Sequence, residues 1–490
     1  MTAHKINIFY VSLSATLFKW GLFIVLLVPQ ISMANSKEAL FNAFDATEVD
    51  IPMSRQTDLG RAFIFHLHSQ YDLIDDPEIN HYIQTLGHRI AQHTHSNKHF
   101  RFYIINNPDI NAFAGPDGVI GIHTGLIQSV STEDELASVI AHEIAHVTQE
   151  HLYRRMALQS EQSLPQIASM IAAILIGMSD PNAGMAALMG SSAFQIEKQL
   201  KYSRMHEYEA DHEGIELLNQ SGYNPHAMPD FFEKLAKSYQ HQGTSMPEIL
   251  RTHPLSENRL AKAQARAHSL NQNINKLHNT TLKLIQIRLE NIYQVQRPVE
   301  FDTDLDQQAQ CYQSALKALN DRTASQSSFN CIDLIIKNGT KESLFHALAL
   351  QLDASKTESK TNTASKNAAS FSYELFPSNQ SIILRYAEWL KHTKNIQKAI
   401  QVLENYLVKD NYKISSLILL AKLHENQGNT AKSYYFLSLA QLEIGNLKRA
   451  AIFITKAKND LLPKNVLFKD NINKLEEKLS KLLKKREERQ

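Results

Sequence analysis

Residues 139–147 read VIAHEIAHV, and this stretch sets the interpretation of the rest of the chain. His142 and His146 are four residues apart, so on an α-helix their side chains project from the same side, one turn apart. Two such imidazoles can bind one Zn²⁺ ion, and Glu143 can act as general base on a zinc-bound water. The same pattern also arises by chance on a buried helix in a chain with 22 histidines. Further ligands are therefore needed to support a metal site.

A second part of the predicted site follows in residues 202–211, which read YSRMHEYEAD. Glu207 can supply a third zinc ligand, and Asp211, one helical turn later, can hydrogen-bond a ligating histidine. Two histidines and one glutamate leave the fourth zinc position open for water, as a catalytic zinc requires. Glu209 and Glu213 repeat the same spacing, so spacing alone does not choose between the two pairs. A solvated acidic helix face is the simplest alternative.

A zinc site built from three histidines is excluded by the residues that follow the motif. Such a site requires a glycine at position 149 and a histidine at position 152, whereas the chain has Gln149 and Leu152. On a continuous helix His151 points away from His142 and His146. We therefore expect His151 at the surface.

The composition of the 490 residues is that of a globular protein with about two domains, at 43% hydrophobic and 21% charged residues. A formal net charge of +1 argues against a nucleic-acid-binding protein. The first residues differ, because an apolar run at residues 21–28 precedes Pro29 and small residues up to Ala34. This pattern predicts a signal peptide cleaved after Ala34, with an uncleaved membrane anchor over residues 6–28 as the alternative.

The two cysteines, Cys311 and Cys331, lie far from the histidine motif in the sequence. An exported chain occupies an oxidising compartment, where an even pair of cysteines can form a disulfide. The two residues lie in consecutive predicted helices, so a bridge is geometrically feasible. A pair of buried thiols is the alternative.

Short strands and longer helices are predicted before the motif. Apolar periodicity favours helices at residues 59–73 and 76–92, and strand patterns occur at residues 100–105 and 119–123. Hydroxyl and acidic residues at 131–135 open the helix that carries the motif. The region is therefore expected to be an α+β domain, mostly helical with a small sheet.

Residues 167–189 are rich in Ala and Met and predict a helical hairpin. Its apolar part is too short to cross a bilayer. The hairpin can belong to the core, form a lid over a catalytic cleft, or offer a surface to a membrane or a client protein. No segment beyond residue 34 has the length and hydropathy of a membrane span, which argues against an integral-membrane protease.

The C-terminal part predicts repeated helical pairs. The turn residues 394–395 and 428–429 lie 34 residues apart, and a similar pair at 445–446 follows 17 residues later. A unit of this length, split into two helices, is the tetratricopeptide (TPR) period. Leu390 corresponds to His424, which breaks the apolar pattern. Unspecified helical hairpins are therefore the alternative to TPR units.

Three blocks of the sequence resemble the signature of the HtpX/CAAX-protease-like gluzincin family. They read HEIAH at 142–146, SRMHEYEAD at 203–211 and THPLSENRL at 252–260, and residues 104–114 also match. Within that family, the exported form with a helical-repeat tail resembles a group of periplasmic proteases of Gram-negative bacteria. The resemblance implies a zincin-like fold with one Zn²⁺ per chain. It also implies these roles: His142, His146 and Glu207, in preference to Glu209, as zinc ligands, Glu143 as catalytic base, and Asp211 as the catalytic-site residue that supports a ligand.

The same resemblance implies two further roles. A loop histidine of that group can occupy the fourth zinc position and hold the enzyme inactive, and His253 lies in the matching block. The simpler reading is that His253 and Pro254 only start a helix that Arg259 ties down. An extended substrate would pair with an edge strand through main-chain hydrogen bonds. The matching edge strand consists of Asn111, Ala112, Phe113 and Ala114.

The expected protein is thus an exported zinc endopeptidase in the periplasm. We expect a signal peptide at 1–34, an α+β zincin-like metalloprotease domain at 35–270, linking helices at 271–305 and an all-α TPR-like domain at 306–490. The resemblance implies misassembled outer-membrane proteins as substrates, a chaperone-like role, and outer-membrane assembly machinery as a partner of the TPR-like domain. Peripheral membrane contact is a further expectation. The alternative is a proteolytically latched chaperone or adaptor that acts through its repeats.

Overall fold

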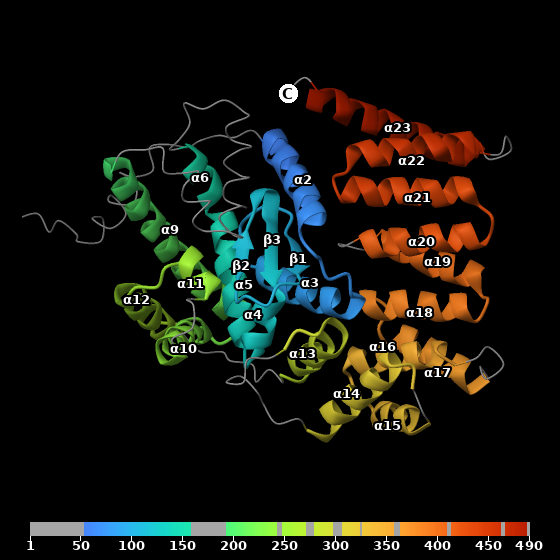
Figure 1. The fold of residues 1–490 in the computed structure, drawn as a ribbon, viewed down its shortest axis with the longest axis horizontal. Helices are drawn as coiled ribbons and strands as arrows, with labels where there is room; N and C mark the ends of the chain where they lie inside the picture. The colour runs from blue at the N-terminus through green and yellow to red at the C-terminus, as the bar shows by residue number, and fades with distance from the viewer. Residues whose placement is uncertain are drawn as a thin grey trace, which may run out of the picture. The chain divides into compact units, whose positions relative to one another are not determined.

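The computed structural model describes most of the chain (Figure 1). The signal peptide expected over residues 1–34 and the hairpin expected over residues 167–189 lie outside the described residues. In the part that is described, no helix combines the length and apolar character needed to cross a membrane. The described residues are 53–157, 193–242, 247–270, 279–296, 306–323, 326–356, 363–408, 413–461 and 466–487.

A small sheet packs against the helix that carries the histidine motif. Its strands are β1 (Arg101–Ile105), β2 (Ala112–Ala114) and β3 (Val119–His123), in the spatial order β1-β3-β2. β3 pairs in parallel with β1 and antiparallel with β2, so β2 is an edge strand of this sheet. At Gly121, in the central strand, an added Cβ atom would lie 2.2 Å from the ring of Phe113. Glycine is therefore required for this close approach.

Helix α5 (Glu133–Thr148) carries the motif through the middle of the core. Thr132 caps it by accepting a hydrogen bond from a first-turn N–H, and the acidic first turn suits the positive end of the helix dipole. All residues from 136 to 147 are buried, so α5 is packed on every side. The helix cannot continue past Glu150, whose backbone is left-handed with a φ of 55°. A separate helix, α6 (His151–Ala157), begins immediately.

The other helices around the sheet place α5 against the rest of the site. α9 (Ala193–Gln220) lies along α5 and carries the second sequence block. α4 (Thr124–Ser129) is not predicted from the sequence, because it is short and all its residues are buried, so it has no solvent-exposed polar face to give a period. The remaining helices of this part are α2 (Met53–Gln70), α3 (Pro77–Ala91), α10 (Ala227–Gln242), α11 (Glu248–Thr252), α12 (Glu257–His268) and α13 (Thr280–Tyr293).

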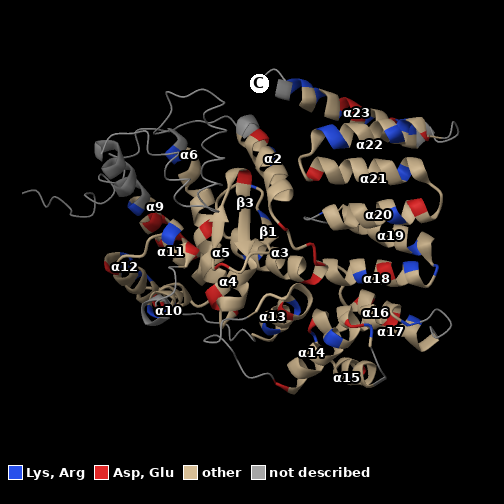
Figure 2. Ribbon diagram, viewed as in Figure 1, with Lys and Arg blue, Asp and Glu red and all other residues tan. Residues whose placement is uncertain are grey.

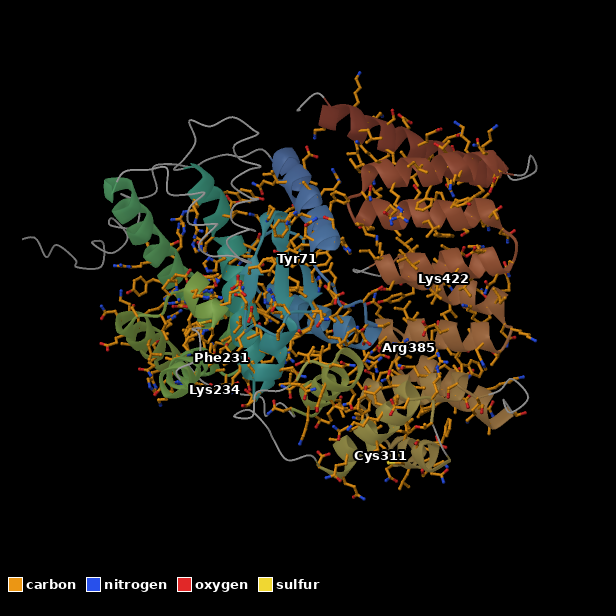
Figure 3. All side chains as sticks on the ribbon, viewed as in Figure 1. Tyr71, Phe231, Lys234, Cys311, Arg385 and Lys422 are labelled. Carbon is orange, nitrogen blue, oxygen red and sulfur yellow. A yellow bond between two sulfur atoms is a disulfide. The ribbon has the colours of Figure 1, made fainter. Side chains whose placement is uncertain are left out.

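From residue 306 onwards the described chain is helical. A disulfide joins Cys311 to Cys331 and connects its first two helices (Figure 3). Lys394, Gly428 and Gly445 have φ values of 62°, 73° and 82° at turns between successive helices, which explains the recurring turn pairs. The assignment of these helices to the TPR class stays a prediction. The helices are α14 (Gln307–Asn320), α15 (Gln326–Lys337), α16 (Ser343–Ala354), α17 (Thr363–Leu375), α18 (Gln380–His392), α19 (Ile396–Leu407), α20 (Ile414–Asn426), α21 (Thr430–Glu443), α22 (Leu447–Asn459) and α23 (Val466–Glu487).

Buried ion pairs connect α3 with the helical tail, whose charged residues are coloured in Figure 2. Glu78 accepts hydrogen bonds from Nε and Nη2 of Arg385 at 2.8 Å each and lies 3.1 Å from Arg288. Arg288 also donates to Asp76 at 2.8 Å. The expected fold class, an α+β domain with a small sheet followed by a helical region, is confirmed. The exact domain boundaries stay a prediction.

Candidate metal centre

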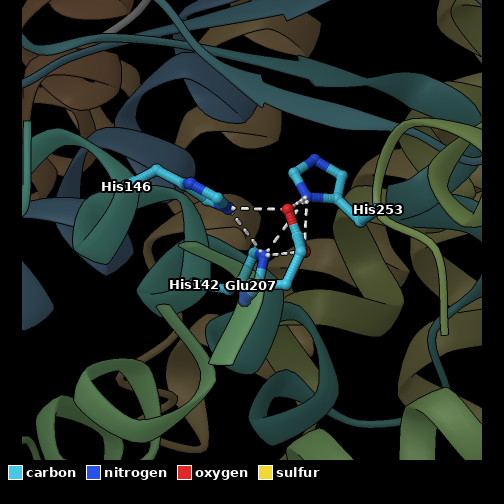
Figure 4. A group of neighbouring side chains, drawn as sticks. All are labelled: His142, His146, Glu207 and His253. Atoms are coloured by element: carbon cyan, nitrogen blue, oxygen red, sulfur yellow. Dashed lines mark hydrogen bonds and ion pairs between the residues drawn. The ribbon is translucent and has the colours of Figure 1, made fainter. Parts of the chain in front are cut away.

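Three sequence blocks meet in one buried cluster. α5 contributes His142 and His146, α9 contributes Glu207, and the residue after α11 is His253 (Figure 4). One candidate ligand atom from each of the four lies within 4.8 Å of the others. The two Nε2 atoms of the α5 histidines are 3.0 Å apart. The Glu207 carboxylate lies 3.5 and 3.6 Å from those same atoms.

His253 faces the other three members of the cluster. Its Nδ1 lies 3.1 Å from Glu207 Oε2 and 3.3 Å from His142 Nε2. Arg259 also donates to the main-chain oxygens of His253 and Pro254, at 3.2 Å each. Arg259 thus ties down the segment before α12, as the simpler alternative expects, and the side chain of His253 also faces the cluster. A role of His253 as a zinc ligand stays a prediction.

Glu143 lies on the same helix and is fully buried. Neither carboxylate oxygen has a hydrogen-bond partner among the described residues. It faces His253, whose Nε2 is 3.5 Å from Glu143 Oε1. A buried carboxylate without a donor is costly, so its position is explained if it meets a group absent from the protein itself, such as a water that gives up a proton.

The carboxylate of Asp211 supports the first histidine. Its Oδ1 lies 3.0 Å from His142 Nδ1. Arg259 donates to both oxygens of Asp211, at 2.5 and 2.8 Å, and also lies 2.9 Å from Glu207. This arrangement holds the imidazole with its Nε2 toward the cluster, as partners of metal-binding histidines do.

The electrostatics of the cluster differ between the two histidines. Burial opposes the charged form of His142, but hydrogen bonding and charge from Asp211 and Glu207 outweigh it and raise its pKa to about 9. Burial dominates at His146 and keeps its pKa well below the ordinary value. For Glu207, burial is outweighed by His253 and the α5 histidines, which hold the carboxyl pKa well below its usual range. The cluster thus contains an ionised carboxylate surrounded by imidazoles.

The expectation that His151 lies at the surface is wrong. Its side chain is only 3% exposed, and its Nδ1 lies 2.8 Å from His146 Nδ1. The expectation assumed one continuous helix, whereas the left-handed Glu150 ends α5 and redirects His151 toward the cluster. No glycine or proline marks this break in the sequence. Nothing in the sequence therefore indicates the positive φ at Glu150.

Glu209, the rival ligand, faces away from the cluster. It lies 2.9 Å from His151 Nε2 and accepts a hydrogen bond from Arg154 at 2.6 Å. Burial alone would raise the pKa of Glu209, but these two partners outweigh it and lower the pKa to about 2. Of the two acidic pairs with equal spacing, Glu207 and Asp211 face the histidines of α5.

The segment expected as the edge strand is bonded to the sheet and to the helix that precedes His253. Ala112, Phe113 and Ala114 form β2, while Asn111 precedes the strand and its oxygen accepts a hydrogen bond from His123 N at 3.0 Å. The preceding Ile110 oxygen accepts from Ile249 N of α11, also at 3.0 Å. The short helix that leads to His253 is thus bonded to the segment that leads into the edge strand.

The donor set fits a divalent metal. Two imidazole nitrogens and one carboxylate oxygen are the ligands of many catalytic zinc sites, which keep a further position for water. The buried Glu143 beside them, whose oxygens accept no hydrogen bond from the described residues, matches a site that handles such a water. These residues fit a metal better than a structural hydrogen-bond network. The Nε2 atoms of His142 and His146 lie 3.0 Å apart and face each other, as expected of two ligands of one ion.

Comparison with known proteins agrees with this chemistry. Residues 77–267 match Peptidase family M48. The chain is 38% identical over 240 residues to the beta-barrel assembly-enhancing protease of Escherichia coli (strain K12), covering 49% of each chain. It is 41% identical over 209 residues to the putative beta-barrel assembly-enhancing protease of Vibrio cholerae, covering 42% of this chain and 43% of the relative.

A more distant relative is the mitochondrial metalloendopeptidase OMA1 of Arabidopsis thaliana, 31% identical over 169 residues, which are 34% of this chain and 32% of the relative. The matched part of the chain spans about half the length of the bacterial relatives. The family match over residues 77–267 includes the cluster residues His142, His146, Glu207 and His253. Residues 77–267 are therefore similar to Peptidase family M48, and the chain is similar over about half of its length to beta-barrel assembly-enhancing proteases.

Proposed function

We propose that the protein is a zinc metalloendopeptidase in which His142, His146 and Glu207 bind one Zn²⁺ ion. The observation that carries the proposal is the convergence of these three side chains, from α5 and α9, beside the buried Glu143. The match to Peptidase family M48 over the same segment supports it. The match to relatives that are named proteases does not favour the alternative of an adaptor without activity.

Glu143 would act as the catalytic base. A bound Zn²⁺ supplies an electrophile for the scissile carbonyl and lowers the pKa of a water molecule. Glu143 would accept a proton from the attacking water and would then deliver a proton to the leaving amine. Its lack of a hydrogen-bond partner among the described residues leaves both oxygens available for this task. Asp211, held by Arg259, keeps His142 in the orientation that binds metal.

The substrate would be an extended chain that pairs with β2. β2 is an edge of the described sheet, and main-chain pairing at an edge gives affinity with little sequence choice. Unfolded or misassembled outer-membrane β-barrel proteins have exposed strand segments of this kind. The names of the bacterial relatives support this substrate class. Export through a signal peptide over residues 1–34 would place the enzyme in the periplasm, with the helical tail contacting the assembly machinery.

His253 would be a fourth zinc ligand that restrains activity. Its Nδ1 lies 3.1 Å from Glu207 and its Nε2 lies 3.5 Å from Glu143, so in this position it would compete with a substrate carbonyl or a water for a bound metal ion. Replacing it is expected to free that position without removing the three other ligands.

Cleavage of an unfolded porin and of casein tests this function, with zinc content measured for each protein. We expect Glu143→Gln to keep its zinc and to lose about 10²–10⁴-fold in rate, because the general base is removed. We expect His253→Ala to cleave faster than the wild type. His226→Ala, a similarly half-buried histidine outside the cluster, serves as the control.

Three outcomes count against the proposal. Wild-type rates for Glu143→Gln would show that the cleavage comes from another source. Zinc-loaded proteins that cleave nothing, His253→Ala included, would favour the adaptor. A wild-type protein that binds no zinc would contradict the proposal that the protein is a zinc metalloendopeptidase.

A further inference from the structure

A second polar network lies behind His146, on the side opposite the cluster. Its first contact is between His146 Nδ1 and His151 Nδ1, at 2.8 Å. His151 Nε2 then lies 2.9 Å from Glu209 Oε2, and that carboxylate accepts a hydrogen bond from Arg154 Nη1 at 2.6 Å. The residues come from α5, α6 and α9, so the network exists only because α5 ends at Glu150 and α6 turns back.

The chemistry of the partners fixes where each proton sits. An ionised carboxylate only accepts, so the Nε2 of His151 that faces Glu209 must carry a hydrogen. In the neutral ring of His151, Nδ1 is then without a hydrogen and accepts. The facing Nδ1 of His146 must therefore donate. This leaves Nε2 of His146 with a free lone pair.

That lone pair points into the proposed metal site. His146 Nε2 lies 3.0 Å from His142 Nε2 and 3.6 Å from Glu207 Oε1. A neutral imidazole can bind a metal only through the nitrogen that carries no hydrogen. The hydrogen bonds that start at Glu209 therefore fix the hydrogen of His146 on Nδ1. This is the tautomer that can bind a metal through Nε2.

Packing holds the intermediate ring in place. The ring of His206 stacks on that of His151 with centroids 4.1 Å apart and planes 13° apart. His206 is fully buried and His151 nearly so. The stacked imidazole of His151 is therefore hindered from rotating, so its Nδ1 and not its Nε2 stays directed at His146.

We infer that His151 is a positioning residue for the metal centre, acting with Glu209 and Arg154 to hold His146 as the tautomer whose Nε2 binds zinc. This inference rests on the proposed zinc site. It concerns residues outside the predicted ligand set, and it gives His146 a supporting carboxylate of its own, reached through an intervening imidazole. A purely structural role of His151 makes a different prediction, because it requires the shape of the ring and not its hydrogen-bonding atoms.

Three substitutions at position 151 separate these roles. Phe keeps the planar ring and removes both nitrogens. Asn places a carbonyl oxygen where Nδ1 was, so it can still accept from His146, whereas Gln places its terminal group where Nε2 was and reaches toward Glu209. His346→Phe is the matched control, since His346 is 1% exposed and its Nδ1 lies 3.0 Å from Ser372 Oγ in the helical tail.

Zinc affinity is measured by competition with a chromogenic chelator, and the melting temperature of each zinc-free protein is recorded alongside. We expect His151→Phe and His151→Gln to bind zinc about 10–100-fold more weakly than the wild type, the usual cost of losing a partner of a ligating histidine. We expect His151→Asn to recover most of that loss. His346→Phe should bind zinc as tightly as the wild type even where its melting temperature falls.

The results have distinct meanings. Unchanged affinity in His151→Phe, with zinc binding by the wild type, overturns this inference and leaves the proposed function intact. Equal losses in His151→Phe and His151→Asn that follow their melting temperatures overturn it as well, because shape alone would then explain them. A wild-type protein that binds no zinc overturns the proposed function, and the inference with it.

Discussion

The two histidines of α5 are supported in different ways. His142 meets a carboxylate directly, since Asp211 lies 3.0 Å from its Nδ1 and is held by Arg259. His146 reaches its carboxylate, Glu209, only through His151. We call Asp211 with Arg259 the direct arm, and His151 with Glu209 and Arg154 the longer arm. Each arm ends in an ion pair between a carboxylate and an arginine. The first pair is buried on both sides, whereas the arginine of the second is partly exposed.

The two ion pairs that support the proposed metal site differ in how deeply they are buried. Arg259 and Asp211 have side chains that are 3% and 5% exposed, so each depends on the other for its charge to be tolerated. The Arg154 side chain is 32% exposed and can be hydrated if its partner is lost. We expect the direct arm to contribute to both folding and metal binding, and the longer arm mainly to metal binding.

The largest expected effect is at the direct arm. In Asp211→Ala the buried Arg259 loses its main partner, and we expect the zinc-free protein to lose about 3 kcal/mol of stability. Zinc binding should also weaken, because His142 loses the group that orients it. Urea unfolding and chelator competition measure the two losses.

A double variant sharpens this prediction. Asp211→Ala combined with Arg259→Met also removes the guanidinium that has lost its main partner, so the double variant should be less destabilised than the sum of the single changes. Glu257→Ala, an exposed acidic residue at the start of α12, is the control and should change stability by less than about 0.5 kcal/mol. Additive losses in the double variant would show that the ion pair is not coupled.

A smaller effect is expected at the longer arm. Glu209→Ala should cost about 1 kcal/mol or less, because water can solvate Arg154. Zinc affinity should still fall by up to about tenfold, since His151 loses the carboxylate that orients its hydrogen. Glu209→Gln keeps an acceptor and should bind zinc nearly as well as the wild type. If Glu209→Ala destabilises the protein as much as Asp211→Ala, the distinction between the arms is wrong.

The sequence predicts the direct arm and misses the longer one for a physical reason. His142 and His146 lie at helical spacing within one unbroken helix, so periodicity is enough to pair them. Glu207 and Asp211 also lie at helical spacing, but Glu209 and Glu213 share that spacing, and only the family resemblance favours Glu207. His151 follows the end of a helix, and its direction depends on one left-handed residue of ordinary composition. Backbone reversals without Gly, Asn or Pro leave little trace in a sequence.

The same contrast holds for the fold. The apolar runs of β1 and β3 and the capped start of α5 are visible in the sequence and lie where they are predicted. α4 is missed because its buried residues have no alternation to detect. The contact of Glu78 with Arg385 joins positions far apart in the chain, and no local pattern indicates such a pair.

The smallest expected effect is the pH dependence of the longer arm. His151 and Arg154 outweigh burial and lower the pKa of Glu209 to about 2, from an ordinary value of 4.5. A carboxyl group with a lowered folded-state pKa contributes stability above the unfolded-state value, and this contribution is lost as the pH falls from about 4.5 toward 2. The stability of the zinc-free protein should therefore decline over this range, with about 1 kcal/mol from Glu209 after solvent screening of Arg154.

Glu209→Gln cannot ionise and should unfold with a shallower pH dependence than the wild type between pH 4.5 and pH 3 in urea titrations. Parallel curves would mean that the carboxylate of Glu209 is not held by its partners, and the two arms would then differ by more than their burial.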